Sequence, residues 1–253
     1  MTSIITIANQ KGGTGKTTTA ITLAHGLALQ GCRVLIVDLD PQGQAAVSLG
    51  LDPEPGVYNW IVRETPLQDV VRATGREKLV LLPGDKGTSR TINFLLAEYR
   101  GAVPMDLLLT LLQPLNGGLD YVVVDTAPSA TELQAAAIYA ARLVLIPART
   151  AYLSEDAVSR TLDTIQAVNE CAGHEPTEFA VLPTFYDQRT ADGERALASY
   201  QAALPHNTLE PIHQATRIAD ASAAGKTIFE VEPKGRPATE YARLVWHVRD
   251  AYG

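Results

Sequence analysis

The chain has 253 residues, 46% of them apolar and 19% charged, with a formal net charge of −7. This composition is typical of a compact folded protein and excludes a disordered or fibrous chain. The acidic balance argues against a wholly basic nucleic-acid-binding surface, so any DNA contact must be regional. Because no linker or low-complexity stretch divides the sequence, we expect a single domain over residues 1–253.

Cysteine usage and the first residues narrow the cellular setting. Cys32 and Cys171 lack the spacing of a metal cage, a disulfide framework or a cluster-binding pair, which favours a reducing, cytoplasmic environment. The segment from Met1 to Ile5 has no basic leader, and no apolar run approaches the ~18 residues that a membrane helix needs. We therefore expect neither secretion nor a membrane span.

Short apolar runs alternate with helical patterns along the chain. The first run, residues 4–8, ends at a glycine-rich turn, and apolar residues then recur at helical spacing over residues 17–30. This alternation predicts an α/β fold with a doubly wound, mainly parallel sheet and helices on both faces. Further strands are expected at 34–37, 79–82, 121–124, 143–146 and 179–182, and helices at 88–99, 105–115, 130–141, 154–170, 192–203 and 239–252.

The last expected helix carries Tyr241, Leu244, Val245 and Val248 at helical spacing. We interpret it as a closing helix docked on the core, and the alternative is a membrane-binding tail. In doubly wound sheets, ligands collect at the carboxyl ends of the strands, where this chain places its most unusual polar residues.

A phosphate-binding loop is the strongest signal in the sequence. It directly follows the first strand and opens the first helix, the context in which backbone N–H groups and a helix N-terminus bind phosphate. A plain glycine-rich turn is the alternative, which the adjoining Gly-Lys-Thr makes a poor explanation. The loop consists of Lys11, Gly12, Gly13, Thr14, Gly15, Lys16, Thr17 and Thr18.

The polar residues of this loop have distinct expected roles. Lys16 would neutralise the β- and γ-phosphates, and the Thr17 hydroxyl would ligate Mg²⁺. Thr18 is a further phosphate donor. The strand at 121–124 ends in Asp125, the Walker B form, and this carboxylate would hold Mg²⁺ directly or through its water shell. Asp38 or Asp40, after the second strand, could cap a loop or help to hold Mg²⁺ through water.

The phosphate loop departs from the ordinary pattern in an informative way. Gln10 stands where glycine is usual, and Lys11 precedes the glycine pair. This arrangement resembles the deviant Walker A motif of the ParA/MinD family of P-loop ATPases, and is closest to short partition ATPases without a helix-turn-helix domain. The resemblance implies ATP as nucleotide, Lys11 reaching the partner's nucleotide in a homodimer, and Asp40 polarising the attacking water. A lone exposed lysine is the alternative for Lys11.

The resemblance also suggests binding surfaces. It implies an adenine site near Thr184 and Pro211, and it places Arg189 and Arg217 where related proteins bind DNA without regard to sequence. Ordinary solvated arginines are the alternative. Such contacts would be salt-sensitive, because they release counterions from phosphates.

The function implied is that of a ParA-like ATPase. Its ATP-bound homodimer would bind nonspecific DNA, and hydrolysis stimulated by a ParB-like or adaptor protein would move a plasmid, chromosome or other cargo. We expect a cytoplasmic, nucleoid-associated protein with slow intrinsic turnover, no stable membrane association, and partner contacts within residues 53–118. The alternatives are a MinD-like membrane ATPase and a metabolic P-loop ligase or synthetase.

Overall fold

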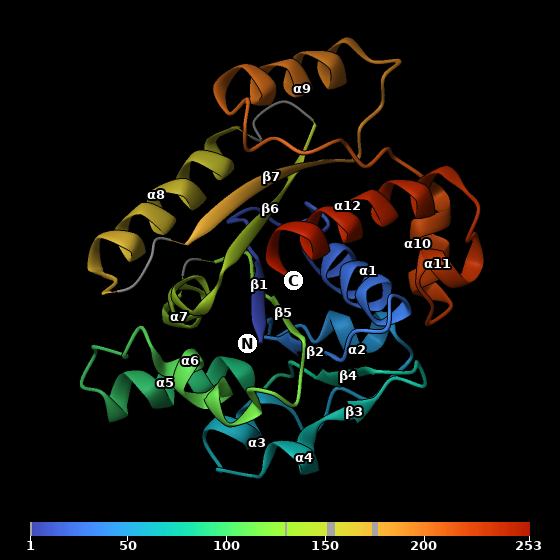
Figure 1. Cartoon of the computed structure of the whole chain (residues 1–253). Helices are drawn as coiled ribbons and strands as arrows, with labels where there is room; N and C mark the ends of the chain where they lie inside the picture. The colour runs from blue at the N-terminus through green and yellow to red at the C-terminus, as the bar shows by residue number, and fades with distance from the viewer. Residues whose placement is uncertain (1, 130, 151–154, 174–176) are drawn as a thin grey trace.

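The computed structural model of the chain describes residues 2–129, 131–150, 155–173 and 177–253. A seven-stranded sheet in the order β3-β4-β2-β5-β1-β6-β7 forms its centre (Figure 1). Its pairs are parallel except for β3, which runs antiparallel to β4 at the edge. The strands are β1 (Ser3–Ile7), β2 (Val34–Asp38), β3 (Arg72–Ala73), β4 (Leu79–Leu82), β5 (Tyr121–Asp125), β6 (Leu143–Arg149) and β7 (Glu178–Thr184).

Helices cover both faces of this sheet (Figure 1), which confirms the predicted fold class. On one face lie α1 (Lys16–Leu29), α2 (Gln44–Ser48), α10 (Thr216–Ala223), α11 (Ile228–Val231) and α12 (Arg236–Tyr252). The other face carries α3 (Val57–Ile61), α4 (Leu67–Val70), α5 (Thr88–Glu98), α6 (Leu107–Leu112), α7 (Glu132–Ala140), α8 (Glu155–Cys171) and α9 (Ala191–Ala203).

The apolar runs are strands because both of their faces are buried. Successive residues of a strand point to opposite faces, so Ile5 and Ile7 join the apolar cluster beneath α1, whereas Ile4 joins the cluster on the other face. All five residues of β1 are buried. Ile residues on both faces, rather than alternation with exposed polar residues, are therefore typical of this central parallel strand, and the buried Thr6 hydroxyl is satisfied by the Ala137 carbonyl.

Several element boundaries differ from the sequence-based predictions. The expected helix at 105–115 is divided into α6 and a 3₁₀ turn, Gln113–Leu115, because Pro114 has no N–H to donate to an α-helical bond. The closing helix begins at Arg236, three residues earlier than predicted, since Pro237 is compatible with a first helical turn. Two helices were predicted to begin at Ala130 and at Ser154, and both of these residues lie outside the described ranges.

The closing helix α12 is docked on the core, as predicted. Tyr241, Leu244, Val245 and Val248 are buried against the sheet and α1, so the apolar face that a membrane tail would need is already occupied. The Ser3 hydroxyl donates to the carbonyl of Tyr252, which holds the two ends of the chain together near the centre of Figure 1. Over the described ranges, no helix combines the length and apolar character required to cross a bilayer.

A buried polar network joins α1 to the short helix α11. His25 of α1 shares a 2.6 Å hydrogen bond between its Nδ1 and the Thr227 hydroxyl, and Glu230 lies 3.9 Å away. Arg76 binds the same Glu230 carboxylate at 2.8 Å. Burial lowers the pKa of His25 to about 4, with Glu230 opposing and Arg76 assisting that shift. His25 is therefore neutral at pH 7.

We expect His25 to make the protein less stable in mild acid. The folded pKa lies below the ordinary value of 6.5, so the unfolded chain takes up this proton first as the pH falls. The contribution of neutral His25 to the free energy of unfolding is present above pH 6.5 and is lost as the pH falls toward 4. About 2 kcal/mol of this free energy is lost between pH 7 and pH 5. Urea unfolding at both pH values should show that loss in the wild type and a smaller one in His25→Gln. Equal losses would contradict this origin.

Candidate functional site

The carboxyl ends of β1, β2 and β5 meet at the centre of the sheet. Ile7 is in register with Asp125, and Asp38 is in register with the same residue from the other side. The phosphate loop follows β1 and leads directly into α1. The topology therefore brings the phosphate loop and the three predicted carboxylates together at the carboxyl ends of the central strands. These carboxylates belong to Asp38, Asp40 and Asp125.

Two glycines give the phosphate loop its shape. Gly13 and Gly15 have φ values of 70° and 89°, in the left-handed region that a residue with a Cβ rarely adopts. A Cβ at Gly12 or Gly13 would meet no described atom within 4 Å, so the outer side of the loop is open. Thr14 is buried, whereas Thr17 and Thr18 are half-buried in the first turn of α1.

Side chains hold the start of the loop in place. Asn9 donates from Nδ2 to the Pro147 carbonyl at 2.8 Å, and its Oδ1 accepts the Lys11 N–H at 3.0 Å. Lys16 donates from Nζ to the Lys11 carbonyl at 3.0 Å. Burial lowers the pKa of Lys16, against the opposing carboxylates of Asp125 and Asp40. The role of Asn9 as an anchor to β6 was not predicted, since nothing in the local sequence distinguishes it.

The two carboxylates after β2 have different surroundings. Asp38 is fully buried and accepts the N–H groups of Asp40 at 2.9 Å and Ala45 at 3.2 Å. Burial, reinforced by Asp125, raises its pKa. Asp40 is half-buried and accepts the Gln42 N–H at 2.9 Å. The loop-capping role that the sequence left open is thus filled by Asp38, which orients the turn carrying Asp40.

Asp125 has the environment of a cation ligand. Its side chain is fully buried, yet neither carboxylate oxygen makes a hydrogen bond of standard geometry. Burial raises its pKa to about 7, opposed by the Thr17 hydroxyl and the Lys16 ammonium. An orphaned carboxylate beside a hydroxyl fits Mg²⁺, which prefers hard oxygen ligands and, when bound, would draw charge from the β- and γ-phosphates.

The metal would also depend on the nucleotide. Across the described ranges, no three or more His, Cys, Asp or Glu side chains are grouped to hold a metal by themselves. Mg²⁺ commonly uses one or two protein oxygens together with substrate phosphates and water. Asp125 and Thr17 fit that smaller share of the coordination shell.

Of the two residues predicted to contact the base, Thr184 binds the phosphate loop itself. The Thr184 hydroxyl is buried and donates to the Thr14 carbonyl at 2.9 Å, so it ties β7 to the phosphate loop. Pro211 is half-buried next to Ile212, whose N–H bonds the carbonyl of Pro183 on β7. Contacts of Thr184 and Pro211 with adenine stay predictions.

An aromatic ring that was not singled out from the sequence covers the flank of the loop. A ring carbon of Phe185 lies 3.4 Å from the position that a Cβ on Gly15 would occupy. The Arg149 guanidinium lies 4.7 Å from the ring centroid. Phe185 has a φ of 52°, and the Thr150 hydroxyl donates to its carbonyl at 3.3 Å. Only the folded backbone reveals this placement.

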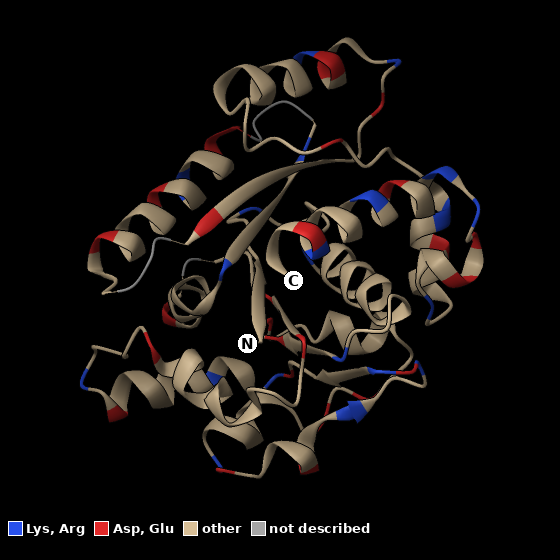
Figure 2. Ribbon diagram, viewed as in Figure 1, with Lys and Arg blue, Asp and Glu red and all other residues tan. Residues whose placement is uncertain are grey.

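The side chains of Arg189 and Arg217 are 84% and 56% exposed. Arg189 is in the loop between β7 and α9, and Arg217 is in α10. Arg189 is paired with Asp187, and Arg217 lies 3.7 Å from Glu232 and 4.0 Å from Asp220. Basic and acidic residues are interspersed over α10 and α11 (Figure 2), so this surface is not uniformly basic.

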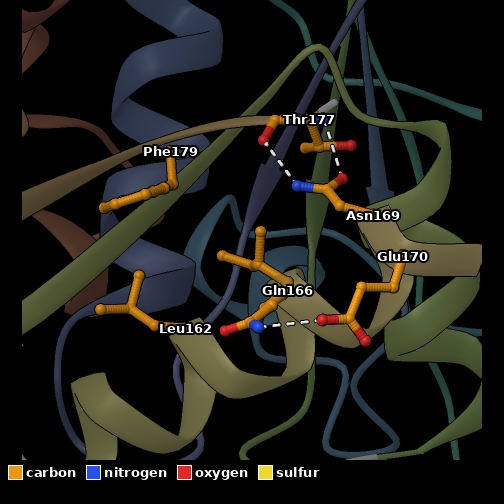
Figure 3. A pocket seen from close by; sticks show the side chains of 7 residues that line it. Leu162, Gln166, Asn169, Glu170, Thr177 and Phe179 are labelled. Atoms are coloured by element: carbon orange, nitrogen blue, oxygen red, sulfur yellow. Dashed lines mark hydrogen bonds between the residues drawn. The ribbon is translucent and has the colours of Figure 1, made fainter. Parts of the chain in front are cut away.

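A hollow of about 430 Å³ lies between α8 and the start of β7. Figure 3 shows hydrogen bonds among the residues that line it: Gln166 donates to Glu170 at 2.9 Å, and the Asn169 amide bonds the backbone N–H and carbonyl of Thr177. It adjoins the amino end of β7, whereas the phosphate loop lies at the carboxyl ends of the strands. The hollow is therefore separate from the nucleotide site.

Comparisons with known proteins agree with this geometry. A family model described as an AAA domain matches residues 2–175. The chromosome-partitioning ATPase Soj of Thermus thermophilus is 36% identical over 96% of this chain and 94% of its own. The chain belongs to the ParA/Soj family of ATPases. That membership confirms the resemblance drawn from the phosphate loop.

Two solved structures show how far the family likeness extends. McdA from Cyanothece is 25% identical, with a TM-score of 0.87 over 98% of this chain and 100% of McdA. A structure described as cobyrinic acid a,c-diamide synthase from Mycobacterium smegmatis is 28% identical, with a TM-score of 0.82 over 98% and 94% of the two chains. The ParA/Soj architecture is therefore shared by proteins whose names denote different activities.

The observed contact of Thr184 in this ParA/Soj-family protein predicts equal effects on two nucleotides. Thr184→Val should weaken ATP and GTP binding by the same factor, about fivefold, because it loosens the Thr14 carbonyl without changing the base contacts. Titration with fluorescent analogues of both nucleotides measures this. Thr208→Val, which removes a hydroxyl bonded to Tyr200 and Leu204, is the matched control. A changed ATP:GTP ratio would instead indicate a base contact.

Proposed function

We propose that the protein is an ATP-driven positioning switch. Its ATP-bound homodimer binds DNA without sequence preference, and hydrolysis stimulated by a ParB-like or adaptor protein releases the DNA. The observation that carries this proposal is the phosphate loop with Lys11 ahead of its glycines, set beside Asp40 and the orphaned carboxylate of Asp125. ATP and Mg²⁺ are the ligands that complete this set of charges.

The open outer side of the loop supports dimerisation. Gly12 and Gly13 are exposed, and no described atom lies near a Cβ placed on either. The Lys11 backbone is fixed by hydrogen bonds to its N–H and its carbonyl, so the side chain extends from a rigid position. A partner's triphosphate held against this surface would require an additional positive charge, which Lys11 supplies.

Asp40 is the proposed catalytic carboxylate. It lies on a turn fixed by Asp38, and it contributes to the electrostatic environment of both Lys16 and Asp125. A carboxylate at this position would orient and polarise the water that attacks the γ-phosphate. Slow turnover without an activator suits a switch that must persist in its ATP state.

A second candidate is ATP-dependent ligation or amidation of a small molecule, favoured by the likeness to the diamide synthase structure. A hollow of about 480 Å³ beside β4, lined in part by Glu54, Asp85, Lys86 and Arg90, could admit a polar substrate. It adjoins Gly84, which packs against the Asp40 backbone. ADP release that depends on an added small molecule, and not on DNA or a protein, would favour this candidate.

Lys11 and Asp40 should affect different steps. Lys11→Ala is expected to abolish ATP-dependent dimerisation, because the charge facing the partner's phosphates is lost. Asp40→Asn should retain the dimer and lower hydrolysis by about 10²–10⁴-fold, the usual range for removal of a general base. Analytical ultracentrifugation with ATP and phosphate-release assays measure the two steps. Unchanged dimerisation and hydrolysis in both variants would refute these roles.

The two exposed arginines should affect DNA binding alone. Arg189→Ala combined with Arg217→Ala is expected to weaken binding of the ATP dimer to unrelated DNA sequences and to reduce the salt slope by about one for each lost phosphate contact. Dimerisation should be retained, since both side chains are exposed and neither belongs to the phosphate loop. Arg195→Ala, on the outer surface of α9, is the control. Full retention of DNA affinity would exclude this surface.

A further inference from the structure

The loop before α9 places a carboxylate directly against one of the proposed DNA-binding arginines. Asp187 accepts from Arg189 Nε at 2.9 Å through Oδ1 and from Nη2 at 2.8 Å through Oδ2, a two-pronged contact. A phosphate group engages a guanidinium through the same pair of donors. Asp187 thus occupies the positions that DNA phosphate oxygens would take.

The backbone fixes this contact in place. The Asp187 Oδ1 also accepts the Arg189 N–H at 3.0 Å, and Tyr186 exchanges backbone bonds with Ile212 and Gln214. Thr190 then caps α9 by accepting the Gly193 N–H. The Arg189 guanidinium holds the pKa of Asp187 well below its usual range, so the carboxylate is charged at any working pH.

The wider surface does not outweigh this charge. Residues 187–236 contain six lysines and arginines against seven aspartates and glutamates. Arg217 is held less closely than Arg189, at 3.7 Å and 4.0 Å from its two carboxylates. Lys226 and Lys234 make no ion pair with any residue that the structure describes. Of the two arginines proposed to bind DNA, Arg189 is therefore the one whose charge is more directly masked.

We propose that Asp187 is a built-in competitor that limits the DNA affinity of the ATP dimer by holding Arg189 in place of a DNA phosphate. This inference rests on the proposed DNA-binding function and adds a residue that regulates it. A DNA phosphate must displace the carboxylate and then lie beside its negative charge. The result is weak, readily reversed binding, which suits a protein that must leave DNA after hydrolysis.

The effect should be modest because the pair is exposed to solvent. Surface ion pairs of this kind change an equilibrium by about 1.4- to 5-fold. The dimer carries two copies of the surface, so the two effects multiply where both contact one DNA molecule. Asp187→Asn should therefore strengthen binding by about 2- to 25-fold.

Asp187→Asn is a conservative test of this role. Asparagine keeps an Oδ1 that can accept the Arg189 N–H, so the turn is preserved while the competing charge is lost. Asp192→Asn is the matched control, because it removes the same charge from a pair with Arg195 on the next helix. Binding to duplex DNA of scrambled sequence should be measured with ATP over a salt series, with dimerisation followed in parallel.

The decisive measurement is a double-mutant cycle. Asp187→Asn should tighten DNA binding in the wild-type background and have a much smaller effect when Arg189→Ala is already present. Asp192→Asn should change affinity less than Asp187→Asn. An equal gain with and without Arg189, an equal gain from the control, or no gain at all would overturn the role of Asp187.

The outcomes separate this inference from the function on which it rests. DNA binding by the wild type that depends on Arg189 but not on Asp187 would overturn only the competitor. No DNA binding with ATP, by the wild type or by Asp187→Asn, would overturn the proposed function and the competitor together.

Discussion

The constraint on which the site depends is the burial of carboxylates where no water can solvate them. Parallel register sets Asp38 beside Asp125, and both are fully buried at the carboxyl ends of their strands. Asp125 opposes ionisation of Asp38, Asp40 opposes ionisation of Asp125, and the Thr17 hydroxyl and the Lys16 ammonium offset part of the charge on Asp125. A buried charge without a partner is costly, so this arrangement favours a bound cation and phosphate. The incomplete charge balance supports the proposed binding of Mg²⁺ and nucleotide at this edge.

Backbone donors distinguish the three carboxylates by function. Asp38 accepts two N–H groups and serves the loop, whereas Asp40 accepts one and remains half-buried. Asp125 accepts none of standard geometry. A carboxylate that is satisfied by the backbone has little capacity left for a ligand, whereas an orphaned one has all of it. The local hydrogen bonds thus assign a structural role to Asp38 and support the proposed role of Asp125 as a metal ligand.

Much of this arrangement could be predicted from the sequence because it is encoded locally. Continuous apolar runs identify the parallel strands, and the glycines with Lys16 and Thr17 identify the phosphate loop. The two-residue edge strand β3 has too few residues to show a period. The Thr184 hydroxyl contacts a carbonyl 170 residues away, and no local pattern signals such a contact. The sequence also cannot show that Asp38 accepts two backbone N–H groups and Asp40 only one.

The nucleotide site and the proposed DNA surface share one packed unit. Helix α1 begins at the phosphate loop and reaches Thr227, at the start of α11, through His25. Helix α2 follows the Asp40 turn, and Gly50 beyond it packs against Gly225 so closely that their backbones are in contact. Both routes end beside α10, which carries Arg217. This packing connects the nucleotide site physically to the proposed DNA surface. Energetic coupling between the two would also require that α10 and α11 have two arrangements that differ in affinity for nucleotide. A Cβ on Gly225 would lie 3.1 Å from the Gly50 Cα, so a side chain at this position would force the segment after α2 and the segment after α10 apart.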